Sequence, residues 1–202
     1  MSKLKVRTQH DMSLTSPLHQ DAVINDKNFT AWQYNVADHL KGKTVEEIKQ
    51  HLKDTAHPFA VAMENWRGDF NFSTMVRNAN AFNAKAIYYV GDKKVDRRGM
   101  VGCHNYTDVV FIPTISELLK LKEQYLFVGV DNISCSKPLV SFSWQKIPLL
   151  IFGSEDTGLT PDMIKMCDEL VFIEQYGSVR SLNAGVASGI VMYDFVRKYR
   201  NQ

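Results

Sequence analysis

Short, continuously apolar runs alternate with helical patterns along most of this chain. Such runs are typical of strands in a parallel sheet, because those strands are buried on both faces. Between two of the runs, apolar side chains recur at helical spacing from Phe72 to Phe82 and leave Arg77 outside the apolar side. The pattern predicts an α/β fold in which helices flank a mostly parallel sheet. The predicted strands are residues 59–63, 86–90, 109–112, 125–130, 147–152 and 170–173.

Two helices are predicted in the C-terminal part of the chain. Residues 160–162 (Thr-Pro-Asp) form a helix start, with a capping side chain, a first-turn proline and an early acid. Residues 181–199 predict a long terminal helix whose first half is crowded with small residues. A glycine inside a helix costs about 1 kcal/mol relative to alanine, so Gly185 and Gly189 need a reason. Close approach of a ligand, of another backbone or of a partner subunit would each supply one.

Residues 1–56 differ in character from the rest of the chain. They are polar and rich in Asn, Asp, His and Lys, with one amphipathic stretch near residues 45–52. We therefore predict an N-terminal extension over residues 1–56 and a single domain over residues 57–202.

Two polar loops that contain glycine follow the last two predicted strands. They are residues 153–159 and 176–183. Ligands of open α/β sheets bind in the crevice outside the carboxyl ends of the strands, so the loops are predicted to form one small-molecule site. Gly153 and Gly158 would let the backbone approach a ligand closely, and Glu155 adds a charge that suits a cation or hydroxyl groups. The alternative is that residues 153–158 only connect a strand to a helix.

Several common types of site have no motif in the chain. The first loop lacks the Gly-Lys-Ser/Thr ending of a phosphate-binding P-loop. No G-x-G-x-x-G follows the first strand, which disfavours an ordinary dinucleotide-binding fold. No G-x-S-x-G elbow is present either, so a hydrolase nucleophile has no anchor.

Composition narrows the class of protein further. Of 202 residues, 45% are hydrophobic and 23% charged, which are ordinary globular values. No apolar run reaches the roughly 20 residues that span a bilayer, and the basic N-terminus has no apolar region behind it, unlike a secretory signal. Cys103, Cys135 and Cys167 are widely spaced, which favours neither a disulfide framework nor a zinc site. We expect a cytoplasmic protein with no membrane segment and no metal.

Basic residues occur in clusters, although the net charge is only +2. Such clusters suit phosphate groups, and a solvated surface is the alternative for any one of them. The clusters are Lys3, Lys5 and Arg7, then Lys93, Lys94, Arg97 and Arg98, and finally Arg197, Lys198 and Arg200.

Three motifs occur in order along the chain. In residues 71–82 an asparagine, Asn71, precedes Arg77 by six positions; residues 149–159 and 173–187 contain the two loops, and the third motif centres on Ser-Leu-Asn at 181–183. Together the motifs resemble those of the TrmH (SpoU) family of RNA ribose methyltransferases, in the knotted SPOUT superfamily. The resemblance covers about residues 58–199, and the connecting residues 96–102 are similar to a loop that these enzymes carry.

This resemblance implies a fold, a cofactor and an oligomeric state. The C-terminal part of the mostly parallel sheet would form a deep trefoil knot, and residues 57–202 would be a SPOUT methyltransferase domain. S-adenosylmethionine would be bound by the knot loops, and an obligate homodimer would place the active sites at its interface. The residues implied in cofactor binding are Phe152, Gly153, Ser154, Glu155, Gly158, Ile173, Gln175, Gly177, Leu182, Asn183 and Ala187.

The implied reaction is methyl transfer to a ribose 2′-hydroxyl of structured RNA. Family similarity places Arg77 at that hydroxyl, but a guanidinium is a poor base. Holding the adjacent phosphate or stabilising the forming alkoxide suits Arg77 better, and a surface ion pair is the structural alternative. Asn71 would orient the ribose or Arg77, unless it caps a helix. Glu155, Ser181 and Asn183 would organise the site, with Ser181 also capping the terminal helix, and Arg77, Lys93, Lys94, Arg97 and Arg98 would contact RNA.

The chain departs from the family pattern at three positions, and two other functions are possible from the sequence. Ser73 and Asn83 stand where the family often has glycine, and Glu174 stands where proline is frequent. Transfer RNA is favoured over ribosomal RNA, because no substantial N-terminal RNA-binding domain is evident. The alternatives are a catalytically silent, knotted RNA-binding protein and an enzyme that methylates an RNA base.

Overall fold

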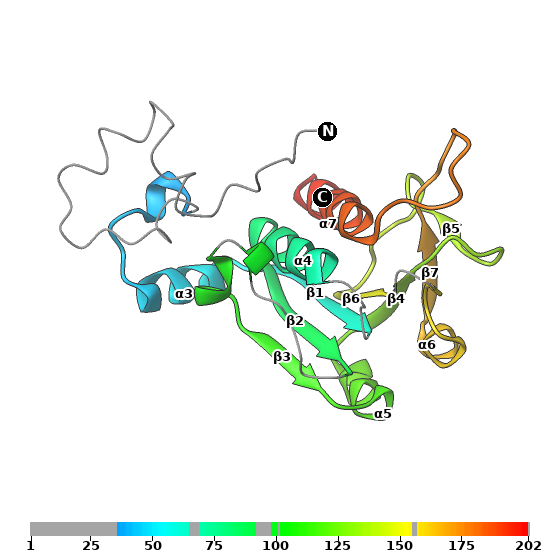
Figure 1. Cartoon of the computed structure of the whole chain (residues 1–202), viewed down its shortest axis with the longest axis horizontal. Coiled ribbons are helices and arrows are strands. Elements are labelled where there is room, and N and C mark those ends of the chain that lie inside the picture. Colours follow the sequence, from blue (N-terminus) through cyan, green and yellow to red (C-terminus); the bar gives the residue numbers. More distant parts are fainter. Residues whose placement is uncertain (1–35, 65–68, 92–97, 101, 155–156, 202) are drawn as a thin grey trace, which may run out of the picture. The chain divides into compact units, whose positions relative to one another are not determined.

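The computed structural model describes residues 36–64, 69–91, 98–100, 102–154 and 157–201, without the side chains of Asp69, Phe70 and Arg98. The chain divides into two compact units, Met1–Gly42 and Lys43–Gln202. In the first unit, a short 3-10 helix spans Asp38–Leu40. The second unit contains the sheet and all the elements described below (Figure 1). A domain boundary at residue 56 stays a prediction.

In the described part of the chain, a seven-stranded sheet forms the centre of the second unit, and its strand pairs run parallel. The strand order is β3-β2-β1-β6-β4-β7-β5. This confirms the predicted parallel sheet and all of its predicted strands. Only β5 was not predicted, since it is a two-residue edge strand that includes a proline. The strands are β1 (His57–Glu64), β2 (Ala84–Val90), β3 (Val109–Ile112), β4 (Leu126–Val130), β5 (Lys137–Pro138), β6 (Pro148–Phe152) and β7 (Glu169–Phe172).

Successive residues of the central strands are buried in two different hydrophobic clusters. Phe59, Val61 and Met63 of β1 belong to one cluster, and Ala60 and Ala62 belong to the other. This follows from the two-residue side-chain period of a strand. Because both clusters are buried, the sheet is covered on both faces, as the continuous apolar runs predict.

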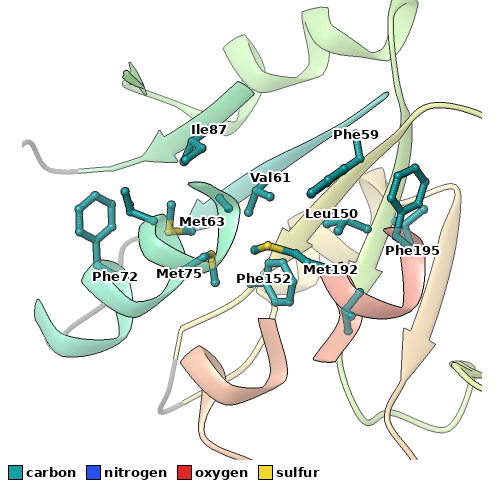
Figure 2. Packing of buried hydrophobic residues seen from close by; sticks show 14 of the residues in the cluster. Phe59, Val61, Met63, Phe72, Met75, Ile87, Leu150, Phe152, Met192 and Phe195 are labelled. Carbon is teal, nitrogen blue, oxygen red and sulfur yellow. The ribbon is translucent and has the colours of Figure 1, made fainter. Parts of the chain in front are cut away.

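Helices α4 (Asp69–Ala81) and α7 (Ala184–Arg200) cover one face of the sheet. Helices α5 (Ile115–Leu118) and α6 (Pro161–Met166) contribute to the cluster on the other face. Figure 2 shows Met75 of α4 and Met192 and Phe195 of α7 directed toward the side chains of β1 and β6. The Phe59 and Phe195 rings lie 5.0 Å apart between centroids.

The helix ends follow local capping chemistry. Thr160 accepts a hydrogen bond from the Met163 N–H at 3.3 Å, which confirms the predicted start of α6. Helix α7 begins later than predicted, at Ala184, because Asn183 is its cap and accepts from the Val186 N–H at 3.1 Å. The prediction that Ser181 caps this helix was therefore wrong. Helix α3 (Val45–Asp54) fills the predicted amphipathic stretch and starts with a capping box.

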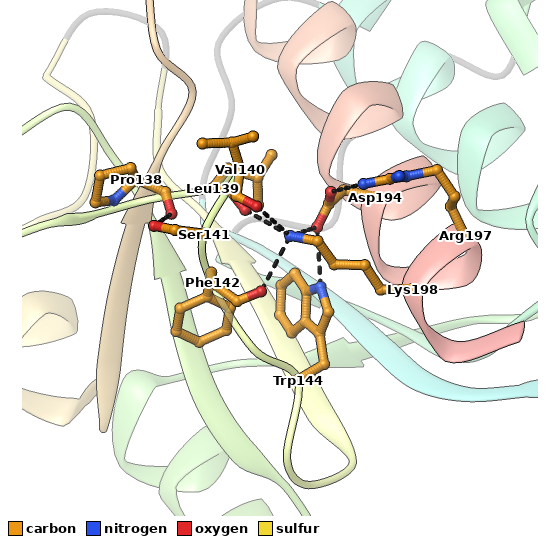
Figure 3. A network of polar contacts seen from close by, with 9 residues as sticks. All are labelled: Pro138, Leu139, Val140, Ser141, Phe142, Trp144, Asp194, Arg197 and Lys198. Carbon is orange, nitrogen blue, oxygen red and sulfur yellow. Dashed lines mark hydrogen bonds and ion pairs between the residues drawn. The ribbon is translucent and has the colours of Figure 1, made fainter. Parts of the chain in front are cut away.

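A polar network fastens α7 to the segment between β5 and β6 (Figure 3). Lys198 Nζ donates to three carbonyl oxygens within residues 139–142, at 2.7, 3.1 and 3.0 Å. The same Nζ lies 2.9 Å from the buried carboxylate of Asp194, which also accepts from Trp144 Nε1 at 3.0 Å. A buried charge is tolerated when it is paired and hydrogen-bonded in this way. The network ties the C-terminal helix to residues about fifty positions earlier in the chain.

Candidate functional site

The strand order brings the two glycine-containing loops to opposite sides of β4. One loop follows β6 and the other follows β7, and β4 lies between these strands. All three strands are parallel, so their carboxyl ends meet at the same edge of the sheet. This arrangement supports the prediction that the loops contribute to one site.

The first loop is a tight turn that requires glycine at both ends. Ser154 and Gly158 exchange two backbone hydrogen bonds, at 3.0 and 2.9 Å, and Gly158 has a φ of +69°. A Cβ on Gly153 would lie 2.1 Å from the carbonyl carbon of Gly158, far inside van der Waals contact. The two glycines therefore let the backbone at the ends of the loop pack closely, with Gly153 against Gly158 and Gly158 against Asp131. Glu155 lies outside the described residues.

The second loop projects from the end of β7. Residues 176–181 are exposed, and the Tyr176 side chain is 94% exposed. Gln175 differs from them, because its Oε1 atom is buried and has no hydrogen-bond partner among the described residues. Such a buried acceptor calls for a donor. Ile173, Leu182 and Ala187 are half-buried near the same loop, and Gly177 is exposed.

Phe152 and Asn183, which are both implied in cofactor binding, have side chains that are engaged in the fold. Phe152 is buried in the cluster beneath α4 and α7, so only its backbone is available at the strand end. The side-chain oxygen of Asn183 is engaged in capping α7. Both residues thus shape the site through the backbone that they hold.

Helix α4, which carries Asn71 and Arg77, is joined to the start of α7. Asn78 Nδ2 donates to the Gly185 carbonyl at 2.9 Å and to Ser188 Oγ at 3.0 Å. A Cβ on Gly185 would lie 2.9 Å from Thr74, and one on Gly189 would lie 3.1 Å from Asn78. Of the three reasons considered for these glycines, the structure therefore supports close approach of another helix of the same chain.

Asn71 and Arg77 lie on α4 in different environments. Asn71 is buried, whereas Arg77 is exposed. Asn71 lies inside the helix, which begins at Asp69, so the alternative that Asn71 is its cap is wrong. An exposed guanidinium is available to an external partner, as a role toward RNA requires. Of the other predicted RNA contacts, Lys93, Lys94 and Arg97 lie outside the described residues, as does the side chain of Arg98.

Two of the departures from the family pattern have a structural explanation. Ser73 is buried, and a Cβ on Gly99 would lie only 2.6 Å from the Ser73 Cβ. The added bulk at position 73 is thus accommodated by a glycine in the facing turn. Asn83 has a φ of 49°, a left-handed conformation that asparagine tolerates better than most residues.

Cysteine chemistry is disfavoured at the site. Burial raises the pKa of the Cys103 thiol to about 11, although the nearby Arg77 guanidinium opposes part of this rise. Burial likewise raises the pKa of Cys167 to about 12. Both groups are protonated at neutral pH, so neither is an activated nucleophile.

We expect iodoacetamide at pH 8 to alkylate Cys135 first, because Cys135 is exposed. Cys103 and Cys167 should react only after unfolding or as the pH approaches the raised pKa values. Mass spectrometry of tryptic peptides measures the order of modification. Alkylation of Cys103 at the same rate as Cys135 in the folded protein would contradict the burial argument.

Glu64 and Asp131 also lie at the candidate site, and no sequence motif assigned them a role. Glu64 ends β1 and accepts from Thr160 Oγ1 at 3.2 and 3.1 Å. Asp131 follows β4 and accepts from the Leu159 N–H at 2.8 Å. In the sequence, each of these two acids comes directly after an apolar run. That position is the feature from which a role at the carboxyl edge of the sheet could have been predicted.

In the described part of the chain, no group of three or more His, Cys, Asp or Glu residues is placed to hold a metal ion. No helix in the same part is long and apolar enough to cross a membrane.

The protein has an α/β fold with a candidate ligand site at the carboxyl edge of a parallel sheet. The model of the SpoU rRNA methylase family matches residues 58–193. The chain belongs to this family.

Curated relatives and solved structures agree with this assignment. A tRNA (guanosine(18)-2′-O)-methyltransferase of Aquifex aeolicus is 26% identical over 164 residues, covering 77% of each protein. The 23S rRNA (guanosine-2′-O-)-methyltransferase RlmB of Acinetobacter baylyi is 22% identical over 161 residues, covering 76% of this chain and 65% of the relative. The crystal structure of the A. aeolicus TrmH/SpoU tRNA modifying enzyme has a TM-score of 0.69 at 23% identity, covering 78% of this chain and 83% of that one. AviRb from Streptomyces viridochromogenes, in complex with AdoMet, has a TM-score of 0.64 at 23% identity, covering 74% and 61%.

Proposed function

We propose that this protein is an S-adenosylmethionine-dependent methyltransferase that acts on a ribose 2′-hydroxyl of structured RNA. Membership of the SpoU family supports the class of reaction, and the relatives above are named as RNA 2′-O-methyltransferases. The observation that carries the proposal is the meeting of the two loops at one sheet edge beside β4. The presence of Asn71, Arg77, Glu155, Ser181 and Asn183 favours an enzyme, because a catalytically silent scaffold needs none of them.

One described residue fits S-adenosylmethionine directly. Gln175 Oε1 offers a buried acceptor to an amino or hydroxyl group of the adenosine. The proposed binding residues are Phe152, Gly153, Ser154, Glu155, Gly158, Ile173, Gln175, Gly177, Leu182, Asn183 and Ala187.

When bound, this cofactor supplies an electrophilic methyl group on a sulfonium. The protein's own contribution is to position the acceptor, since an in-line displacement depends strongly on alignment. Arg77 holds the phosphate next to the reacting ribose and stabilises negative charge that develops on its 2′-oxygen. Arg77 does not remove the proton, because a guanidinium stays protonated. Asn71 orients Arg77 or the ribose, and Glu155, Ser181 and Asn183 organise the surrounding loops.

The proposal includes a trefoil knot and a homodimer. The proposed knot rests on membership of the SpoU family, and the contacts of α7 with residues 139–144 place the C-terminal helix beside an earlier segment of the chain. Val186, Ile190 and Tyr193 are 52%, 38% and 57% exposed at helical spacing on α7, and this apolar stripe supports a partner subunit there. The SPOUT domain is proposed to span residues 57–202, after the extension 1–56, in a cytoplasmic protein that needs no metal.

Transfer RNA is the proposed substrate class. The tRNA enzyme of A. aeolicus matches over 77% of its own length, whereas RlmB of A. baylyi matches over 65% of its length. Arg77, Lys93, Lys94, Arg97 and Arg98 are proposed to bind the RNA backbone, where cations release counterions.

Titration calorimetry with S-adenosylmethionine tests the proposal, with sedimentation of the same sample to give its mass. We expect a dimer that binds S-adenosylmethionine. RNA that has been incubated with the protein and S-adenosylmethionine should then contain 2′-O-methylated nucleosides. Mass spectrometry of the nucleosides separates the outcomes. Absence of S-adenosylmethionine binding by the folded protein would favour a catalytically silent RNA-binding protein. Methyl groups on bases would show that the acceptor is a base and not the ribose 2′-hydroxyl.

A further inference from the structure

Asp131 and Asn132 follow β4 directly, at the point where the two loops of the candidate site face each other. Strand β4 lies between β6 and β7, and the loops continue from these two strands. A side chain that follows β4 is therefore within reach of both loops. The order of the strands, rather than any motif, gives these two residues their position.

Asp131 holds the end of the first loop. Its Oδ2 atom accepts from the Leu159 N–H at 2.8 Å in a part-buried environment. A Cβ on Gly158 would lie 2.4 Å from the same oxygen, so the carboxylate lies directly against the left-handed turn. A hydrogen bond to an ionised acceptor is stronger than a neutral one, and this one fixes the point where the loop joins α6.

Asn132 holds the second loop. Its Nδ2 atom donates to the Arg180 carbonyl at 3.3 Å, and Gln175 Nε2 donates to the same carbonyl at 3.5 Å. These bonds are long and thus weaker than the contact of Asp131. The backbone of Asp131 is itself anchored, because its N–H donates to the Val171 carbonyl at 3.0 Å and its carbonyl accepts from Ser136 Oγ at 2.7 Å.

We propose that Asp131 and Asn132 are positioning residues that brace the two loops against β4 and thereby set the affinity for the methyl donor. This proposal rests on the proposed function. The exposed second loop would otherwise lose conformational freedom on binding, and this loss of entropy weakens binding. Holding both loops in place beforehand lowers that cost.

Calorimetry with S-adenosylmethionine, on the full chain, measures the effect. We expect Asp131→Ala to raise the Kd about tenfold or more, from the loss of a hydrogen bond to a charged group. Asp131→Asn should stay within about threefold of the unmodified protein, because its amide oxygen accepts the same N–H. Asn132→Ala should weaken binding only about two- to threefold, since its bond is longer. Asp108→Ala is the matched control, as Asp108 is exposed and pairs with Lys49 on helix α3.

Hydrogen exchange without the donor supplies an independent readout. We expect Asp131→Ala to speed exchange in residues 153–160 and Asn132→Ala to speed it in residues 174–183, while β1 and β2 stay slow. Faster exchange in the loops with an unchanged Kd would overturn the proposal, as would equal losses in Asp131→Ala and Asp131→Asn. If Asp131→Ala unfolds, the Asn132→Ala and Asp131→Asn results decide in its place. If the unmodified protein binds no donor, the proposed function fails. The exchange pattern then still tests whether Asp131 and Asn132 hold the two loops in place.

Discussion

Arg77→Ala is expected to reduce methyl transfer at least about a hundredfold, a loss typical of removing one preorganised group that stabilises transition-state charge. Affinity for S-adenosylmethionine should change little, because Arg77 is an exposed residue of α4, and none of the proposed donor contacts lies on that helix. Single-turnover transfer to RNA, alongside calorimetry with the donor, separates the two effects. The expected split is a lost rate with a retained donor Kd.

Two further variants make the Arg77 prediction specific. Arg77→Lys keeps the charge but loses the planar fork that matches a phosphate, so we expect it to recover only part of the rate. Lys53→Ala removes one exposed positive charge from α3 and should transfer methyl groups normally. Unchanged turnover in Arg77→Ala would refute the assigned role, and an equal loss in Lys53→Ala would point to a general effect of net charge.

Gly153→Ala is expected to abolish detectable donor binding. The added Cβ would meet three backbone atoms of Gly158 and Leu159, at 2.1 to 2.2 Å. Backbone atoms cannot move aside as the end of a flexible side chain does, so the turn must open. We also expect the free energy of unfolding to fall by about 1–3 kcal/mol, as for other overpacked sites. Calorimetry and urea unfolding measure the two quantities.

Gly177→Ala is the matched comparison for the stability effect. Gly177 lies in the second loop, and no described atom lies within 4 Å of where its Cβ would be. The unfolding free energy should therefore stay within about 0.5 kcal/mol of the unmodified protein. If Gly153→Ala binds the donor normally, the described conformation of the first loop is not needed for donor binding.

Much of the fold was predictable because it depends on local pattern. The continuous apolar runs are the central strands, since β1 and β6 bury successive residues in clusters on opposite faces. Thr160 and Pro161 start α6 as expected from capping chemistry alone. The start of α7 was misplaced by three residues because Ser181 and Asn183 are both good caps, and only the backbone decides between them.

The site was predictable in part. Glycines after apolar runs predict the two loops, and the family resemblance adds Arg77 on helix α4. The hydrophobic pattern does not give the order of the strands, because the sequence of one strand does not specify which other strand it pairs with. Asp131 therefore had no apparent role, although β4 places it between the loops. Asn78 was in a recognised motif, yet its bonds to α7 span 107 and 110 positions of sequence.

By itself, the sequence determined the class of fold, the strands and the two glycine turns, since hydrophobic period and backbone freedom act over a few residues. Only the tertiary structure decided which strands are neighbours, and hence that the loops after β6 and β7 face each other across β4. It also decided that Gly185 and Gly189 serve contact with α4. These features depend on packing between segments distant in the chain, where the burial of apolar surface, rather than local preference, selects the arrangement.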